Sequence, residues 1–187
     1  MSAQSGVRRD AQRNRQRLLD AALTAFTGES PTVSLESIAK SAGVGIGTLY
    51  RHFPSREALI EAVYRSELEQ LCDQARDLLE RQPPDRALRT WLGRYADFVA
   101  TKRGMAEALR EVITSGAVTS AQTRERLSAA IADIIAAGTS AGLLRSDVRA
   151  QDVTAAMAGA TLAGIDREQI DRLLDLLIDG LRPPQGC

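Results

Sequence analysis

The chain has 187 residues, of which 4% are aromatic, and its 24 Lys and Arg residues balance 24 Asp and Glu residues. This length can bury a sizeable core and fits one or two small domains. No apolar run approaches the roughly 18 residues needed to cross a membrane, and the start lacks the apolar core of a signal peptide. We therefore expect a cytoplasmic protein with no membrane partner.

The composition favours an all-helical fold. Ala, Leu, Arg, Glu and Asp dominate, and no stretch alternates apolar and polar residues as a half-buried strand would. Cys72 falls at an apolar position of a predicted helix and Cys187 ends the chain, so neither indicates a disulfide framework.

The chain begins with an expected loose tail, residues 1–6, followed by a basic run and the first helix. The basic run consists of Arg8, Arg9, Arg13, Arg15 and Arg17. The apolar stripe of the helix is Leu18, Leu19, Ala22, Leu23 and Phe26. Residues 1–56 hold eight Lys or Arg against four Asp or Glu, a net charge of +4, which leaves −4 for the remainder. Such a split suits one end of the molecule meeting a polyanion.

Residues 34–56 contain two short helical patterns around a glycine. Ser34 is a good N-cap, and helical spacing predicts a helix over 35–42. Gly43 can adopt the left-handed conformation that turns the chain. A second helix is predicted over 46–53, because Pro54 pushes the preceding residue out of the helical region.

The second of these helices has two different sides. A helical wheel places Ile46, Leu49 and Phe53 on one side and Gly47, Thr48 and Arg51 on the other, with Tyr50 and His52 between them. A small, hydroxylated and cationic surface fits a DNA major groove, where Thr and Arg can meet base edges. The flanking rings and Arg56 would then lie near phosphates. Alternatively, the two rings only lie at the edge of a small core.

Residues 35–64, LESIAKSAGVGIGTLYRHFPSREALIEAVY, resemble the DNA-binding domain of the tetracycline-repressor (TetR) family of bacterial transcription regulators. The resemblance spans about Arg15 to Tyr64 and includes the RLLDAALTAF helix, the IAxxAGV turn and the GTLYxHFxSxExL tail. It implies that DNA is faced by Ser34, Gly47, Thr48, Tyr50, Arg51, His52 and Arg56. Arg56 stands where lysine is commoner in the family, which keeps the charge but changes the donor geometry.

The rest of the chain predicts six more helices. The first is a single helix of about 27 residues that opens after Ser55 and ends before Pro83 and Pro84; it would span about 40 Å. The others are expected at 85–101, 105–114, 120–141, 150–163 and 167–181. The prediction is thus an all-α, nine-helix protein with an N-terminal helix-turn-helix domain at 1–56 and a C-terminal effector-binding and dimerisation domain at 57–187.

The resemblance implies a small-molecule pocket in the middle of the chain. Aromatic and flexible apolar residues gather there, namely Trp91, Tyr95, Phe98, Met105, Leu109, Ile131 and Ile134. An aromatic stripe can equally be ordinary core. The effector that would fill the pocket has no signature in the sequence.

The resemblance to the TetR family implies that the last two helices form a homodimer interface. The first is rich in small residues and the second carries a bulky stripe, so two such pairs could pack across a two-fold axis. The predicted interface residues are Val153, Ala156, Met157, Ala160, Ile170, Leu173, Leu174 and Leu177. Packing within one chain is the alternative. A dimer is also what the two half-sites of a palindromic operator require.

Enzymatic functions find little support. His52 is the only histidine, so neither a histidine-dependent triad nor a multi-histidine metal site can form, and no cofactor is expected. Gly43, Gly45 and Gly47 lack the strand and the lysine of a phosphate loop. The sequence predicts a homodimeric regulator that binds double-stranded operator DNA and is released by a small molecule. A helical protein-interaction module and a transcriptional activator are the alternatives.

Overall fold

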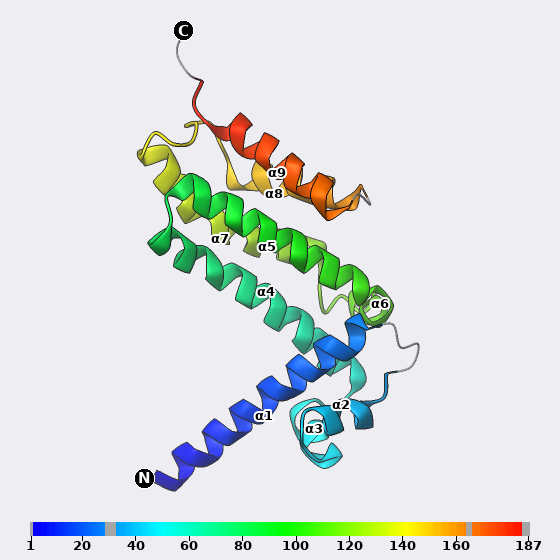
Figure 1. Ribbon diagram of the computed structural model, residues 1–187. Coiled ribbons are helices and arrows are strands. Elements are labelled where there is room, and N and C mark those ends of the chain that lie inside the picture. The colour runs from blue at the N-terminus through cyan, green and yellow to red at the C-terminus, as the bar shows by residue number, and fades with distance from the viewer. Residues whose placement is uncertain (1, 29–32, 164–165, 185–187) are drawn as a thin grey trace. The chain divides into compact units, whose positions relative to one another are not determined.

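The computed structural model describes residues 2–28, 33–163 and 166–184, and within these ranges it contains nine helices and no strand (Figure 1). The predicted all-α, nine-helix fold is confirmed. The helices are α1 (Ser2–Thr27), α2 (Leu35–Ser41), α3 (Ile46–His52), α4 (Arg56–Arg81), α5 (Pro84–Gly104), α6 (Ala106–Thr114), α7 (Ser120–Ser140), α8 (Ala150–Leu162) and α9 (Arg167–Leu181). None of the described helices is both long and apolar enough to cross a lipid bilayer.

The chain divides into two compact units. The first unit comprises Met1–Glu67 and Thr101–Val118, and the second comprises Leu68–Ala100 and Thr119–Cys187. Helices α4 and α5 therefore contribute residues to both units.

Most helix ends match their predicted positions, with two differences. The prediction of a loose tail over residues 1–6 is wrong, because α1 already begins at Ser2. The segment that follows is rich in arginine, glutamine and alanine, which are good helix formers, and this lets the helix extend well before its apolar stripe. Helix α5 runs three residues beyond the predicted range 85–101, to Gly104, the glycine near which the sequence predicts its stop. Cys72 is a free, half-buried thiol on α4, and Cys187 lies outside the described residues.

The core of the first unit forms where α1 packs against α2 and α3. Its buried side chains include Leu18, Leu19, Ala22, Phe26, Ile38, Ala39, Leu49, Phe53, Leu59, Ile60 and Val63. Two phenylalanine rings at the rim of this core are covered by guanidinium groups. Arg15 lies 5.4 Å from the centroid of Phe53, and Arg56 lies 5.0 Å from that of Phe26. Such cation–π contacts stabilise the rim of the core while the charge stays near solvent.

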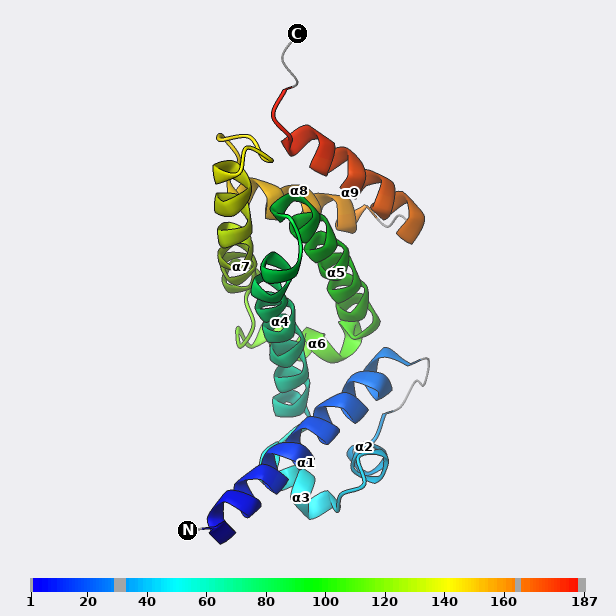
Figure 2. The same cartoon turned by 60° about the vertical axis from the view of Figure 1, so that its left-hand side comes forward.

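The second unit is built around α5, whose Trp91 is fully buried. The indole Nε1 of Trp91 donates a hydrogen bond of 2.8 Å to the carbonyl oxygen of Leu71 on α4, which satisfies its one polar group. Helices α7 and α8 also pack closely (Figure 2), and the hydroxyls of Ser128 and Thr154 share a buried hydrogen bond of 2.8 Å between them.

Helix α9 is held against α5 by a series of ion pairs, which we call the α5–α9 ion-pair row. Arg89 on α5 bonds to Asp171 and Asp175 on α9, at 3.2 and 2.6 Å. Arg167 pairs with Asp97 and Asp171, and Arg182 lies 3.4 Å from Asp85. Because later residues of α5 meet earlier residues of α9, the two helices run antiparallel.

Asp171 in the second unit and Glu67 in the first have pKa values shifted in opposite directions. A hydrogen bond from Arg167 is the main reason why the pKa of Asp171 lies below its ordinary value. The pKa of Glu67, in the first unit, is raised, first by burial and then by the nearby charge of Asp20.

Candidate nucleic-acid interface

The connection between α2 and α3 is a tight helix-turn-helix. The hydroxyl of Ser34 accepts a hydrogen bond of 3.1 Å from the amide of Ser37, which caps α2 as predicted. Gly43 then adopts φ 68°, the left-handed conformation expected from the sequence. The amide of Val44 bonds back to the carbonyl of Ala39 at 3.0 Å, which closes the turn. This geometry fixes the direction in which α3 leaves α2.

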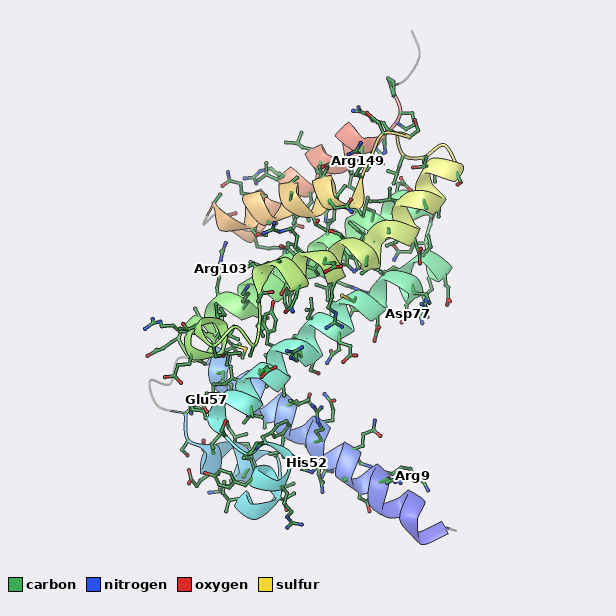
Figure 3. All side chains as sticks on the ribbon, turned by 180° about the vertical axis from the view of Figure 1, so that it is seen from behind. Arg9, His52, Glu57, Asp77, Arg103 and Arg149 are labelled. Carbon is green, nitrogen blue, oxygen red and sulfur yellow. The ribbon has the colours of Figure 1, made fainter. Side chains whose placement is uncertain are left out.

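Helix α3 buries one side and exposes the other. Leu49 is fully buried and Phe53, just after the helix, is 3% exposed. Gly47 and Arg51 are exposed, Tyr50 is 47% exposed, and Thr48 and His52 are half-buried. The predicted surface of small, aromatic and cationic residues therefore lies on the uncovered side of α3. Figure 3 marks His52 on this helix and Arg9 on α1.

Ile46 departs from the helical-wheel prediction. It was expected on the buried side with Leu49 and Phe53, but its side chain is 38% exposed. Ile46 is the first residue of α3 and is left partly uncovered there, whereas Leu49 is fully buried and Phe53, just after the helix, is 3% exposed.

At Gly47 the backbone of α3 is exposed, because this residue has no side chain. A Cβ atom added to Gly47 would meet no atom within 4 Å beyond its chain neighbours and the backbone of its own helix, so packing inside the protein does not require glycine at this position. The Nε of Arg51 donates a hydrogen bond of 3.2 Å to the carbonyl oxygen of Gly47 one turn earlier. The arginine stem is thus held along the exposed side of the helix.

Arg56 contacts other parts of the first unit. It is half-buried, its guanidinium covers Phe26, and its Nη1 donates a hydrogen bond to the carbonyl oxygen of Val33. These contacts join the start of α4 to the segment that precedes α2. The sequence gives the charge of Arg56 but not this partner, which lies 23 residues away.

The basic run predicted from the sequence lies along α1. The side chains of Arg8, Arg9, Arg13, Arg15 and Arg17 are all exposed. Arg13 lies 3.7 Å from Asp10, and both side chains are about two-thirds exposed. Exposed pairs of this kind contribute little to stability. The described residues contain no group of three or more His, Cys, Asp or Glu that could hold a metal ion.

The seven predicted pocket residues are all buried. Trp91, Tyr95, Phe98, Ile131 and Ile134 belong to the second unit, whereas Met105 and Leu109 belong to the first. The rings of Trp91 and Tyr95 stack with centroids 6.0 Å apart, and those of Tyr95 and Phe98 lie 6.5 Å apart. An open groove of about 900 Å³ between α7 and α8 is lined by other residues, including Ser128, Ile135 and Arg149. The pocket assignment stays a prediction.

The predicted dimer residues divide into two groups. Val153, Met157, Ile170 and Leu174 are buried within the chain, whereas Ala160, Leu173 and Leu177 are half-buried and Ala156 is exposed. The most exposed large apolar side chain on α9 is Leu176, at 67%, and sequence reasoning missed it. Its position three residues after Leu173 was the available signal. The dimer assignment also stays a prediction.

Two family models match the chain. Residues 18–63 match bacterial regulatory proteins of the tetR family, and residues 83–183 match the C-terminal domain described as transcriptional regulator SbtR-like. An HTH-type transcriptional regulator of Staphylococcus aureus is 41% identical over 64 residues, which are 34% of this chain and 35% of that protein. The match thus spans about a third of this curated relative's length.

Solved structures extend the similarity over nearly the whole chain. A TetR transcriptional regulator from Streptomyces coelicolor is 46% identical, with a TM-score of 0.81 over 91% of this chain and 99% of that chain. A TetR transcription regulatory protein from Mycobacterium vanbaalenii is 30% identical, with a TM-score of 0.76 over 95% and 99% of the two chains. The chain therefore belongs to the TetR family of bacterial transcriptional regulators, and residues 18–63 match the helix-turn-helix DNA-binding domain of that family.

Proposed function

We propose that the protein is a homodimeric repressor that binds a specific operator through α3 and leaves it when a small molecule binds the second unit. The observation that carries this proposal is the division of α3: Leu49 is fully buried, while Gly47, Tyr50 and Arg51 are exposed on the same seven-residue helix. A helix of this kind, held rigidly after a tight turn, is the element that helix-turn-helix proteins place in the major groove.

In this proposal the residues of α3 have separate roles. Arg51 and Thr48 meet base edges, since guanidinium and hydroxyl groups are the donors that read guanine and neighbouring bases. The open backbone at Gly47 lets the helix approach the groove closely. Tyr50 and His52 on α3, and the hydroxyl of Ser34 at the start of α2, contact phosphates or base edges near the rim of the groove.

The arginines of α1 supply the general attraction to DNA. They are exposed and belong to a segment, residues 1–56, whose net charge is +4. Each phosphate contact displaces condensed counterions from DNA, so this attraction is independent of sequence and weakens with salt. We assign Arg56 a mixed role: its contacts with Phe26 and Val33 position α2, and its charge adds to the attraction.

The dimer is supported by the surface of α9. Leu176 is exposed, with Leu173 and Leu177 half-buried beside it, and a second copy would cover these leucines. A two-fold dimer presents two α3 helices to half-sites about 34 Å apart along DNA.

Effector release requires coupling between the two units. Helix α4 supplies residues to both, so a change in the second unit can act on the start of α4, where Arg56 contacts the DNA-binding helices. An effector that weakens operator binding a hundredfold must favour the DNA-incompetent state by about 2.7 kcal/mol. The buried rings of Trp91, Tyr95 and Phe98 are the proposed lining of its site.

Selection of duplexes from a random pool by the purified full-length protein tests the proposal. We expect enrichment of one palindromic sequence, and sedimentation should show two chains per duplex or a multiple of two. Small molecules are then screened for release of the selected duplex. A protein that enriches no sequence at low salt contradicts the proposed function, and one chain per half-site without dimerisation contradicts the dimer.

A further inference from the structure

Two exposed apolar side chains lie one turn apart on α3. Among the described residues, five large hydrophobic side chains are exposed, and they are Ile46, Tyr50, Ile113, Leu143 and Leu176. Ile46 and Tyr50 thus place two of the five on a helix of seven residues. Residues four apart lie on the same side of a helix, so the two side chains form one apolar strip.

The strip continues the proposed DNA-binding surface. Gly47 directly follows Ile46, and Arg51 directly follows Tyr50. The apolar strip therefore lies next to the side of α3 that carries Gly47 and Arg51. Helix α3 contains no carboxylate, and the exposed arginines of α1 belong to the same unit. A helix surface that is apolar at Ile46 and Tyr50, carries Arg51 beside them and has no carboxylate suits a groove between two phosphate backbones.

The chemistry of Ile46 limits what it can recognise in that groove. An isoleucine side chain has no hydrogen-bond donor or acceptor, so it cannot distinguish the polar edges of guanine, adenine and cytosine. Thymine alone presents an apolar group in the major groove, its C5-methyl, which apolar side chains contact. In helix-turn-helix proteins the first residues of the recognition helix are those that reach base edges, and Ile46 is the first residue of α3.

We infer that Ile46 is a specificity-determining residue that contacts the C5-methyl group of one thymine in each operator half-site. This inference rests on the proposed binding of operator DNA by α3. It predicts that each half-site contains an A·T pair at a fixed place, and that the methyl group of that thymine, more than its hydrogen-bonding edge, is recognised.

Replacing thymine by deoxyuridine tests the inference, because the exchange removes only the methyl group. Each thymine of the duplex selected from the random pool is replaced in turn, and the dissociation constants of the full-length protein are measured by fluorescence anisotropy. Burial of one methyl group corresponds to about a fourfold change in affinity. We expect a fourfold loss for one thymine per half-site and roughly a fifteenfold loss when both are replaced, since distant contributions add.

The variant Ile46→Ala should remove this sensitivity. It is expected to bind the thymine and deoxyuridine duplexes equally at the position where the wild-type protein distinguishes them. Ile113→Ala is the matched control, because Ile113 is an isoleucine of similar exposure, 46%, on α6 of the same unit. Ile113→Ala should bind the deoxyuridine duplex more weakly than the thymine duplex, as the wild type does. Circular dichroism melting checks that both variants keep the fold.

The outcomes separate this inference from the function on which it rests. If the wild-type protein binds its selected duplex but is insensitive to every thymine replacement, or if Ile46→Ala shows the same losses as the wild type, the role of Ile46 is overturned and operator binding stands. The scan of the wild-type protein decides this even if Ile46→Ala is unstable. If no sequence is enriched from the pool, both proposals are overturned.

Discussion

Arginine side chains have different surroundings in the two units. Along α1 of the first unit they are exposed, and Arg15 covers an aromatic ring. In the second unit, Arg89, Arg167 and Arg182 bind carboxylates on a neighbouring helix. A guanidinium beside a carboxylate adds little net charge to its surroundings, so the positive charge available to a polyanion is concentrated in the first unit. In the proposed function the arginines of α1 attract DNA, whereas those of the α5–α9 ion-pair row hold a helix in the second unit.

The largest expected effect comes from salt acting on the exposed arginines. If the dimer neutralises about eight phosphates, the logarithm of operator affinity should fall with the logarithm of salt concentration with a slope of about −7. Between 50 and 200 mM salt this is a loss of about 10⁴-fold, measurable by fluorescence anisotropy. Arg17→Ala should make the slope shallower, whereas Arg172→Ala, in the second unit, should not. A flat salt response contradicts the phosphate contacts.

The next largest effect concerns the two sides of α3. Leu49→Ala leaves a cavity at a fully buried position, and we expect the free energy of unfolding to fall by about 2–5 kcal/mol in urea titrations. Tyr50→Ala, one residue later and 47% exposed, should change it by only about 0.5 kcal/mol while weakening DNA binding. Equal losses of stability in the two variants would show that α3 is not divided into a buried and a recognition side.

The α5–α9 ion-pair row should give a smaller effect. Arg89→Ala removes a guanidinium that bonds to two aspartates and has a side chain 28% exposed, so we expect the free energy of unfolding to fall by about 1 kcal/mol. Arg172→Ala is the control, because its pair with Glu168 lies within α9 and is exposed; about 0.3–0.5 kcal/mol is expected. If the two variants lose the same free energy of unfolding, the α5–α9 ion-pair row does not hold α9 in place.

The smallest expected effect is on how stability depends on pH, which should differ between a carboxyl group of the first unit and one of the second. The pKa of Asp171 is lowered from 3.8 by Arg167, so its contribution to stability is present above that value and is lost as the pH falls through the lowered pKa. The pKa of Glu67 is raised from 4.5 by burial, so stability falls as the pH rises from 4.5 through the raised pKa. Urea titrations at pH 7 should therefore show Glu67→Gln more stable than the wild type and Asp171→Asn less stable.

These two differences should shrink on acidification, each in its own range. The gain from Glu67→Gln should be gone once the pH is below 4.5, where the wild-type carboxyl is also protonated. The loss from Asp171→Asn should diminish only below 3.8. If the free energy of unfolding at pH 7 changes in the same direction in both variants, the causes assigned to the two pKa shifts are wrong.

Much of the fold was predictable because capping residues, glycines and prolines mark the helix ends in the sequence. Helix α9 has the predicted bounds, since Asp166 caps its start and Pro183 follows its end. Gly43 has the left-handed conformation that the turn requires. These signals are local, so they can be read without knowing what the helix packs against.

The rest depended on distant contacts. A helical wheel predicts the side of α3 on which Ile46 lies, but it does not predict how much of that side chain is covered by the rest of the protein. The partner of Arg56 is a carbonyl oxygen beyond the whole helix-turn-helix, and the aspartates of Arg89 lie more than 80 residues away. The aromatic residues of α5 are buried and packed on one another, and an apolar pattern is the same whether it surrounds a ligand or fills a core.

The measurement that tests the central claim most directly is the binding of the selected duplex and a scrambled duplex of equal composition by the wild-type, Arg51→Ala and Arg17→Ala proteins. We predict that the wild type prefers the selected duplex by at least about 10³-fold and that Arg51→Ala loses about 1–3 kcal/mol of this preference. Arg17→Ala should weaken both duplexes alike. Equal binding of both duplexes by the wild type, or an undiminished preference in Arg51→Ala, would contradict the claim that α3 reads DNA.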